Sequence, residues 1–226
     1  MERIAIYDMD KTITRRATFV PFACHVVFRY RPLRIFVVPI MVLAAFAYAS
    51  GFISRTRLKE INLRMLLGRA INASNLGKMA GTFAQSMVSD NVLPAALRQI
   101  AADRAEGYHI VMATASCRFY AENIAHSVDI ADVIATENRI TAAGQILPLI
   151  DGENCYGDAK LRMVKEWLSR QGIDRNAAHI RFYSDHVTDA PCLVWADEAF
   201  AINAHAPLSR LAHLHGWKRL DWLSLA

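Results

Sequence analysis

Short apolar runs alternate with amphipathic stretches along most of this 226-residue chain. Such runs predict strands, and they lie near residues 3–8, 109–114, 131–135, 180–184 and 198–202. Helical periodicity follows two of them, over residues 118–128 and from Gly157 or Asp158 onward. Strands that alternate with helices predict a doubly wound parallel sheet, a Rossmann-like α/β fold. Residues 137–147, with a turn near Gly144, predict a small β-hairpin.

One part of the chain departs from this alternation. Residues 35–53 form a run of nineteen residues without a charge, long enough for a transmembrane helix. The segment after it, residues 56–67, is apolar at Leu58, Ile61 and Met65 and polar at Arg57, Lys59 and Arg64, an amphipathic helical pattern. Basic residues flank the uncharged run on both sides: Arg29, Arg31 and Arg34 before it, and Arg55, Arg57 and Lys59 after it.

The length of the chain is within the usual range for a single domain and is sufficient for a large core. Its cysteines are Cys24, Cys117, Cys155 and Cys192, which form no C-x-x-C pair and indicate a reducing compartment. The chain starts with charged residues followed by an apolar strand, so we expect no signal peptide. Residues 11–89 contain twelve Lys or Arg and one acidic residue, Glu60, against 14 basic and 20 acidic residues elsewhere. The net charge of +5 therefore combines a basic segment with an acidic remainder.

The first apolar run leads directly into a candidate reactive site. Residues 4–12 read I-A-I-Y-D-M-D-K-T, which places Asp8, Asp10 and Thr12 at alternate positions. Open α/β sheets bind ligands at the carboxyl ends of their strands. Two carboxylates there can share a divalent cation and divide nucleophilic and acid/base duties. Taken alone, the motif also arises by chance in an exposed turn.

A second candidate is the hydroxyl at the end of the next strand. Residues 108–116 read Y-H-I-V-M-A-T-A-S, and a helical pattern follows from Arg118. A hydroxyl on Thr114, beside the N-terminus of a helix, offers a donor to phosphate together with free backbone N–H groups. The alternative is that Thr114 or Ser116 only caps that helix.

Lys160 is the candidate cation. It lies in the first turn of the helix that begins at Gly157 or Asp158, whose apolar face carries Leu161, Val164, Trp167 and Leu168. The helix dipole disfavours a lysine in this turn, so its placement indicates an anionic partner nearby. A solvated lysine is the alternative.

Two further carboxylates follow the strand near residues 180–184. The segment H-I-R-F-Y-S-D-H-V-T-D places Asp185 at the strand end and Asp189 four positions later. Hard oxygen ligands beside a phosphate suit magnesium, which takes only one or two protein carboxylates. Asp189 could instead cap the following turn.

The order D-x-D-x-T, Thr, Lys and D-x-x-x-D resembles the haloacid dehalogenase superfamily, in its phosphoserine phosphatase-like branch. The resemblance implies that Asp8 is a nucleophile that forms an aspartyl-phosphate and that Asp10 is general acid, then base. Thr114 and Lys160 would bind the phosphoryl oxygens, and Asp8, the Asp10 carbonyl and Asp185 would bind Mg²⁺. Thr12, Ala115 and Asp189 would support the site.

The resemblance also implies a domain organisation and shows two departures. Residues 13–88 correspond to an inserted helical cap, and residues 1–12 and 89–226 to the catalytic core. Lys11 stands where many relatives carry Gly, and Ser184 where Gly commonly precedes the metal-binding aspartate. Neither change removes a reacting group, but Lys11 adds a charge near the phosphate.

The uncharged run has two interpretations. A single membrane span would separate Asp8 from Thr114, Lys160 and Asp185, so we favour a monotopic or re-entrant cap on an anionic membrane surface. The enzyme would then be cytoplasmic, on the inner face of the cell membrane. The alternative is a soluble cap in which the run is a buried helix, since Pro39 and Ser50-Gly51 shorten it.

The cap composition guides the expected substrate. A phosphoserine-type substrate needs an acidic residue for its ammonium, and the cap has only Glu60. A basic, apolar cap favours a lipid or other apolar phosphomonoester, and the architecture resembles bacterial phosphatidylglycerophosphate phosphatases of this superfamily. The alternatives are a soluble small-metabolite phosphatase or phosphotransferase and a non-catalytic membrane-binding protein. We expect no nucleic-acid partner.

Overall fold

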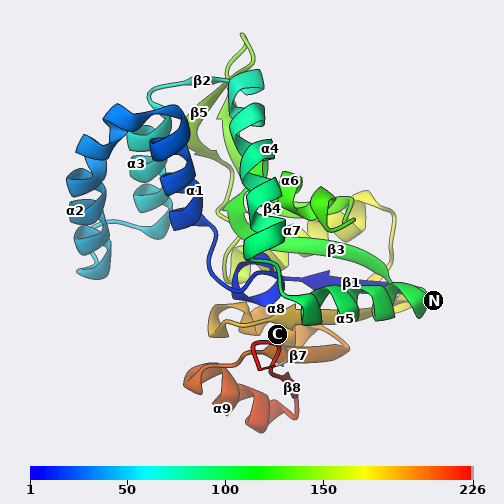
Figure 1. The fold of residues 1–226 in the computed structure, drawn as a ribbon. Coiled ribbons are helices and arrows are strands. Elements are labelled where there is room, and N and C mark those ends of the chain that lie inside the picture. The colour runs from blue at the N-terminus through cyan, green and yellow to red at the C-terminus, as the bar shows by residue number, and fades with distance from the viewer. Residues whose placement is uncertain (225–226) are drawn as a thin grey trace.

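The predicted strands all belong to one sheet in the computed structural model, which describes residues 1–224. The strands are β1 (Glu2–Tyr7), β2 (Ile71–Asn72), β3 (His109–Cys117), β4 (Asp132–Ile140), β5 (Gln145–Asp151), β6 (Ala178–Ser184), β7 (Glu198–Ile202) and β8 (Lys218–Leu220). Their order is β2-β5-β4-β3-β1-β6-β7-β8 (Figure 1). In this spatial order, each strand from β4 through β3, β1, β6 and β7 to β8 is parallel to its neighbour. β5 pairs antiparallel with β4 and β2. The predicted α/β fold is confirmed, although the short edge strands β2 and β8 were not predicted.

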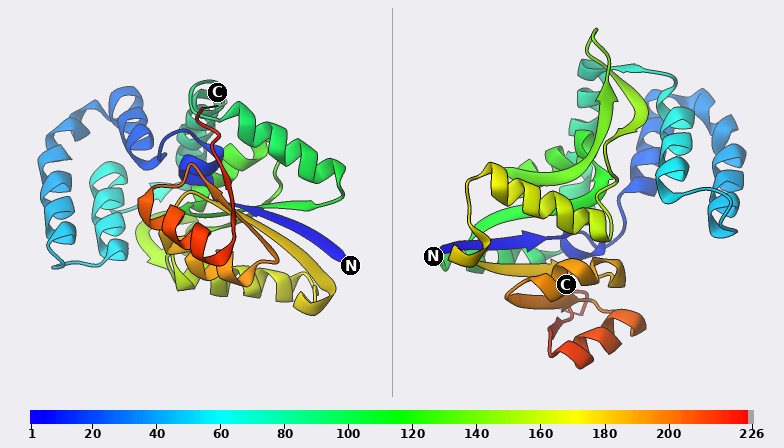
Figure 2. Two further views of the ribbon diagram at one scale, coloured as in Figure 1. Left: turned by 90° about the horizontal axis from the view of Figure 1, so that it is seen from below. Right: turned by 180° about the vertical axis from the view of Figure 1, so that it is seen from behind.

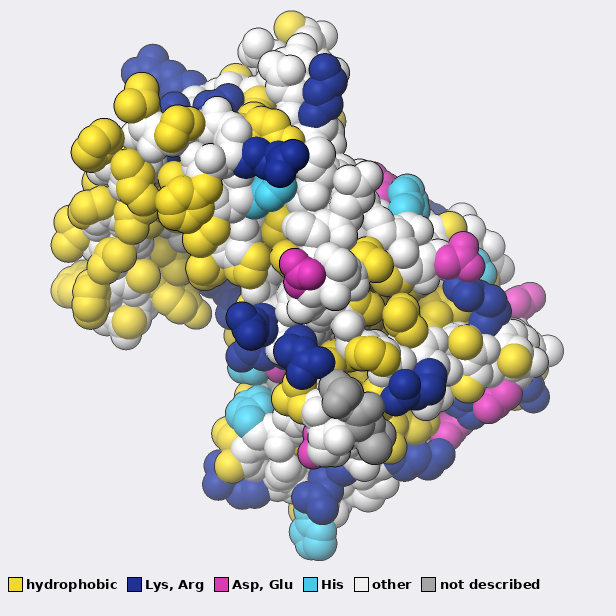
Figure 3. All heavy atoms as spheres, in the orientation of Figure 1, with side chains coloured by type: hydrophobic (Ala, Val, Ile, Leu, Met, Phe, Trp, Pro, Cys, Tyr) yellow, Lys and Arg dark blue, Asp and Glu magenta, His cyan; other side chains and the backbone are white. Residues whose placement is uncertain are grey.

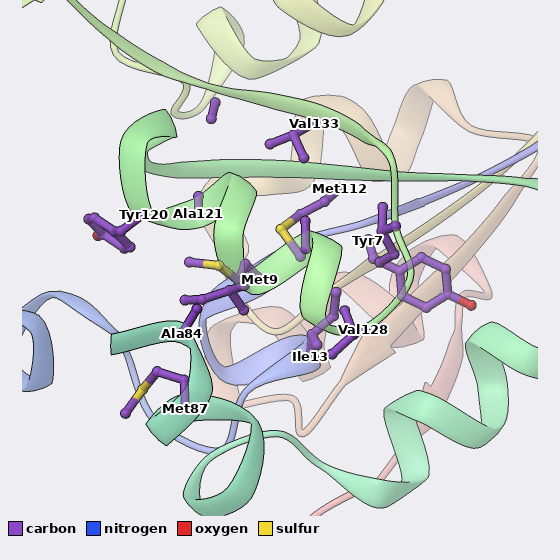
Figure 4. Packing of buried hydrophobic residues seen from close by; sticks show 14 of the residues in the cluster. Tyr7, Met9, Ile13, Ala84, Met87, Met112, Tyr120, Ala121, Val128 and Val133 are labelled. Carbon is purple, nitrogen blue, oxygen red and sulfur yellow. The ribbon is translucent and has the colours of Figure 1, made fainter. Parts of the chain in front are cut away.

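The helices cover both faces of this sheet. They are α1 (Phe19–His25), α2 (Val38–Ala49), α3 (Arg55–Leu67), α4 (Ala73–Asp90), α5 (Pro94–Ala105), α6 (Arg118–Ser127), α7 (Asp158–Arg170), α8 (Ala190–Trp195) and α9 (Ala206–His215). Residues of α4, α5 and α6 pack on one face with Tyr7 and Met112 (Figure 4). Residues of α7, α8 and α9 pack on the other with Ile4 and Ile6. Because β1 is buried on both faces, it reads as a continuous apolar run rather than an alternating one.

The predicted hairpin is present and is longer than expected. β4 continues beyond the parallel part of the sheet and pairs with β5. The turn lies at residues 141–144, where the Gly144 amide donates to the Thr141 carbonyl over 2.9 Å. Gly144 has a φ of 71°, the left-handed conformation that favours glycine. β2 pairs with β5, which joins the inserted segment to the hairpin.

The first three helices form a lobe beside the sheet, in which α3 packs against β5 and α2 lies on the outer side (Figures 1 and 2). We call α1, α2 and α3, with the turns between them, the helical lobe. By contrast, α4 packs along α6 and buries Leu76, Ala80 and Phe83, spaced four and three residues apart. The division of the chain at residues 13 and 88 stays a prediction.

Candidate active site

Asp8 and Asp10 follow the central strand at the point where it leaves the sheet. β1 lies between β3 and β6, and Tyr7 pairs with Met112 on one side and Tyr183 on the other. The Asp8 amide continues this pairing by donating to the Tyr183 carbonyl over 2.9 Å. Asp8 is thereby held beside the ends of both neighbouring strands, as expected for parallel strands whose carboxyl ends share one edge.

The turn after Asp8 requires an unusual backbone conformation at Lys11. Its φ is 61°, in the left-handed region that favours glycine. This explains why Gly suits the position and why Lys11 is a departure that adds strain as well as charge. The Asn203 side chain donates to the Lys11 carbonyl over 3.1 Å.

Lys160 is buried between two carboxylates. Its Nζ lies 2.7 Å from Asp8 Oδ1 and 2.6 Å from Asp189 Oδ2, and Ser184 Oγ also donates to that Asp189 oxygen over 2.8 Å. Burial disfavours its charge, but the two carboxylates hold the pKa of Lys160 above its usual range. The alternative of a solvated lysine is therefore wrong, because Lys160 is only 2% exposed.

Asp185 lies at the end of β6, with a backbone amide that donates to Thr12 Oγ1 over 3.0 Å. Thr12 is fully buried and links the turn after β1 to the end of β6. Among residues 1–224 the Asp185 carboxylate has no hydrogen-bond or ion-pair partner, although it is only 8% exposed. Burial and repulsion from Asp189 raise the pKa of Asp185 to about 7.

The cluster has more negative than positive charge, which is the condition a divalent cation would relieve. Asp8, Asp185 and Asp189 face Lys160 in one cavity. Burial raises the pKa of Asp8, with Lys160 opposing the shift and the other two carboxylates adding to it. Within residues 1–224, no set of three or more His, Cys, Asp or Glu side chains is placed to hold a metal ion. The predicted ligand set has only two side chains and one backbone carbonyl, so Mg²⁺ fits the chemistry of these donors.

Asp10 is held by hydrogen bonds at both carboxylate oxygens. Its Oδ1 accepts from the backbone amide and the hydroxyl of Thr18, over 2.7 and 2.8 Å. Its Oδ2 accepts from Ser116 Oγ over 2.9 Å. Thr18 immediately precedes α1 and Ser116 lies at the end of β3. The Asp10 side chain is therefore oriented jointly by the start of the helical lobe and by the sheet.

The Thr114 side chain lies close to the hydrogen bonds of Asp10 but contacts the Ser116 backbone and not Asp10. It is buried within β3, where its hydroxyl accepts from the Ser116 amide over 3.1 Å. The next residue, Ala115, lines both cavities described below. α6 begins at Arg118, so neither Thr114 nor Ser116 is its N-cap. The phosphate-binding role of Thr114 stays a prediction.

A cavity of about 220 Å³ lies above these side chains, and we call it the acidic cavity. Its walls include most of the predicted set, together with Lys11 and five residues that the motifs did not indicate: Ala17, Arg55, Tyr156, His186 and Thr188. Gly157, with a φ of 59°, turns the chain between Tyr156 and α7. Lys11 thus faces the site, as its position after Asp10 predicts.

A second cavity of about 300 Å³ adjoins the first, and we call it the apolar cavity. Asp10, Arg55 and Ala115 line both, and Asp10 is the only acidic residue of the apolar cavity's lining. The other lining residues are Phe19, Tyr48, Leu58, Lys59, Asn62, Ser116, Cys117 and Tyr120. Arg55, Lys59 and Asn62 lie one turn apart on α3, a spacing that could have indicated a shared face.

The surface of the helical lobe is unusually apolar (Figure 3). Pro32–Ala49 is long and apolar enough to cross a membrane, and 6% of it is buried. Phe36 is 77% exposed, Leu43 67% and Phe46 66%. The alternative of a buried helix is wrong, since Ala44 is the one buried residue of α2. The run is also divided, because a 3₁₀ turn (Pro32–Val37) precedes α2.

The basic flanks of that run do not all face outward. Arg31 and Arg34 donate to the carbonyls of Leu67 and Met65 at the end of α3, over 2.9 and 3.0 Å. Lys59 points toward the sheet and hydrogen-bonds the Ala115 carbonyl. These three cations therefore hold the lobe together or join it to the core.

A sequence model of the haloacid dehalogenase-like hydrolase family matches residues 5–194. That span runs from β1 into α8 and contains every predicted site residue. No curated protein matches the sequence.

Solved structures share the fold. A protein of unknown function from Bordetella pertussis Tohama I has a TM-score of 0.86 at 20% identity, with 98% of this chain and 99% of that chain covered. A probable phosphoserine phosphatase from Vibrio cholerae has a TM-score of 0.67 at 11% identity, with 94% and 58% covered. A phosphoserine phosphatase described as a phospho-aspartyl intermediate analogue has a TM-score of 0.61 at 13% identity, with 92% and 90% covered.

Proposed function

The chain belongs to the haloacid dehalogenase-like hydrolase family, and from this we propose that it is a magnesium-dependent phosphomonoester hydrolase. The observation that carries the proposal is the buried contact of Lys160 with Asp8 and Asp189, beside the unpartnered carboxylate of Asp185. A buried lysine next to a strand-end aspartate provides a cation for phosphoryl oxygens and a nucleophile in the same cavity.

Asp8 is the proposed nucleophile. It attacks phosphorus in line, and the phosphoryl group moves from the substrate oxygen to the Asp8 carboxylate as an aspartyl-phosphate. Lys160 stabilises the negative charge on the transferring group, and Asp189 and Ser184 hold Lys160 in place. Water then attacks the phosphoryl group, which releases inorganic phosphate and regenerates Asp8.

Asp10 is the proposed general acid and base. As a carboxylic acid it protonates the departing alkoxide, and as a carboxylate it deprotonates the water that attacks the intermediate. Its position suits both tasks because it lies where the acidic and apolar cavities meet. The leaving group would occupy the apolar cavity while its phosphoryl group is in the acidic one.

Mg²⁺ would be held by Asp8, the Asp10 carbonyl and Asp185. When bound, it would neutralise charge on the phosphoryl oxygens. The unpartnered Asp185 carboxylate supports this assignment, because a buried carboxylate without a partner is otherwise costly.

We further propose that the substrate is a lipid or other apolar phosphomonoester, such as phosphatidylglycerophosphate. The lone acidic residue of the helical lobe, Glu60, accepts from the Ile150 amide over 3.1 Å and lines neither cavity. A substrate ammonium would thus find no lobe carboxylate. Phe19, Tyr48 and Leu58 give the apolar cavity walls that favour hydrocarbon.

We also propose that the helical lobe lies on a membrane. Tyr48 lines the apolar cavity and belongs to α2, on which Ile40, Leu43 and Phe46 are exposed. If α2 lies in one leaflet of an anionic bilayer, a phospholipid could reach the apolar cavity without leaving the membrane. The enzyme would then be a peripheral or monotopic protein of the inner face of the cell membrane.

The experiment is phosphate release in Mg²⁺ from phosphatidylglycerophosphate in anionic vesicles and from soluble phosphoserine, with Asp8→Asn as the blank. We expect release from the vesicles and none from the blank. The matched control is Asp129→Asn, an exposed position with a φ of 60° that asparagine also tolerates. Turnover of phosphoserine alone would replace the lipid assignment with a soluble phosphatase. Release by Asp8→Asn equal to that of the parent would exclude the nucleophile assignment.

A further inference from the structure

Lys59 is a charged residue of the helical lobe that reaches the end of β3. Its Nζ donates to the Ala115 carbonyl and to Asn154 Oδ1, and it lies 3.3 Å from Thr136 Oγ1. These acceptors lie near the end of β3, in the middle of β4 and in the loop before α7. One side chain therefore joins the lobe to three separate segments of the core.

The surroundings of the Lys59 ammonium are unfavourable for a positive charge. Lys59 is half-buried and forms no ion pair within residues 1–224, so its direct partners are neutral oxygens, and the nearest carboxylate of its cavity, Asp10, acts on it only through space. Burial, and secondarily the nearby Arg55 charge, lower the pKa of Lys59. A leucine or methionine would close the lobe against the core without this desolvation cost. The position thus favours a role other than stability.

The Ala115 carbonyl that Lys59 contacts belongs to the peptide group between Ala115 and Ser116, and the Ser116 side chain contacts Asp10. Thr136 Oγ1 also lies 2.9 Å from that carbonyl, so two groups orient the peptide plane. The amide on the other side of the same peptide, Ser116 N, donates to Thr114 Oγ1 over 3.1 Å. The Ser116 hydroxyl in turn donates to Asp10 Oδ2 over 2.9 Å. Lys59 is therefore connected to Asp10 through one peptide and one side chain.

We propose that Lys59 is a positioning residue that fixes the 115–116 peptide, and through Ser116 the Asp10 carboxyl, when the helical lobe is docked against the core. The inference rests on the proposed function, since it assumes that Asp10 protonates the leaving group. It assigns to α3 a part in the proton-transfer step, not only in enclosing the substrate. Lobe docking and acid alignment then occur together, because the same ammonium supports both.

The test uses two phosphomonoesters that differ in their need for an acid. A nitrophenolate leaves without protonation, whereas an alkoxide needs a proton from Asp10. For Lys59→Met we expect the rate of aspartyl-phosphate formation, measured by rapid quench, to fall about 10- to 100-fold with glycerol 3-phosphate and less than about 3-fold with 4-nitrophenyl phosphate, because in that step only the alkoxide needs the acid. Asp10→Asn provides the benchmark for complete loss of the acid.

The control is Arg64→Met, which removes a cation from an exposed position on the same helix outside both cavities. We expect it to change neither rate. Lys59→Gln, which keeps a short N–H donor, is made in parallel in case Lys59→Met does not fold, and should show the same leaving-group dependence at smaller amplitude. Circular dichroism melting of each variant verifies folding.

Equal losses on the two esters, or no loss, would overturn the positioning role while leaving the phosphatase assignment intact. An unmodified enzyme that hydrolyses neither ester nor the vesicle lipid would overturn both. An increase in KM alone, with the rate of aspartyl-phosphate formation unchanged for both esters, would also overturn the inference, because it would place Lys59 in substrate enclosure alone.

Discussion

The acidic cavity and the helical lobe use charged and apolar residues in opposite ways. In the cavity, Asp8, Lys160 and Asp189 are buried, and Lys160 contacts both carboxylates. In the lobe, Phe36, Leu43 and Phe46 are exposed while charged side chains such as Arg31 and Lys59 turn inward. Each arrangement by itself is unfavourable for a protein in water, because buried charges lose their hydration and exposed hydrocarbon contacts water.

The proposed function gives both arrangements a reason. Mg²⁺ would relieve the surplus of carboxylates in the acidic cavity, and a membrane would cover the exposed apolar face of α2. The two regions meet at Asp10, Arg55 and Ala115, the residues that line both cavities. A substrate with a phosphate at one end and hydrocarbon at the other matches both regions at once.

The largest expected effect concerns the residue where the two regions meet. Asp10→Asn cannot protonate the leaving oxygen or activate water, so we expect kcat on the lipid to fall about 10²- to 10⁴-fold. Rapid-quench measurement of aspartyl-phosphate formation and breakdown would show both steps slowed. Asparagine preserves the size of the side chain, which limits structural change. Full turnover by Asp10→Asn would mean that another group is the acid.

A smaller effect is expected from making the lobe surface polar. Replacing Phe36, Leu43 and Phe46 together with serine removes three exposed apolar side chains from the proposed membrane face. Since each buried apolar side chain contributes about 1.5–3 kcal/mol, sedimentation with anionic vesicles should weaken by about 100-fold or more. Turnover of a soluble ester should be unchanged, because none of the three lines a cavity.

A matched triple variant tests whether position matters or only hydrophobicity. Ile140, Val194 and Leu214 are 67%, 59% and 75% exposed and lie outside the helical lobe. Their replacement with serine should leave vesicle binding as it was. If both triple variants bind vesicles as well as the parent, the lobe is not a membrane-binding surface.

The smallest effect is a pH-dependent stabilisation by Mg²⁺. Asp185 has a pKa raised to about 7 in the folded protein, against 3.8 for its usual value, so the folded state holds the proton more tightly than the unfolded one. Raising the pH from about 4 to 7 therefore costs folding stability in the absence of metal. Mg²⁺ binds the ionised form, so its stabilisation should be present above pH 7 and lost as the pH falls below it.

Thermal melting checks this prediction. We expect a few millimolar MgCl₂ to raise Tm by about 2–4 °C at pH 8 and by less than about 1 °C at pH 5.5. Asp185→Asn should melt higher than the parent without metal at pH 8 and should not respond to Mg²⁺. An equal response to Mg²⁺ at both pH values would argue against Asp185 as a ligand.

The pattern of apolar and polar residues along the chain was sufficient to predict the main strands of the sheet and the candidate reactive side chains near their ends. The strand ends before Asp8 and Asp185 were predicted because buried parallel strands read as apolar runs, and reactive residues follow them directly. The end predicted at Thr114 was wrong, since β3 continues to Cys117. The hairpin was predicted at its turn but not at its length, since β4 begins as a parallel strand and continues as an antiparallel one. The short strands β2 and β8 carry too few residues to produce a pattern.

The amino-acid sequence by itself determined the family, the α/β fold and the set of aspartates and lysine, because each depends on residues a few positions apart. Only the tertiary structure decided which charges face the site and which apolar residues face outward. Lys59 appeared as one more basic residue beside an uncharged run, yet it contacts Ala115 and Asn154, 56 and 95 residues away. Such contacts depend on how helices pack on a sheet, and periodicity along the chain contains no information about a partner that far away.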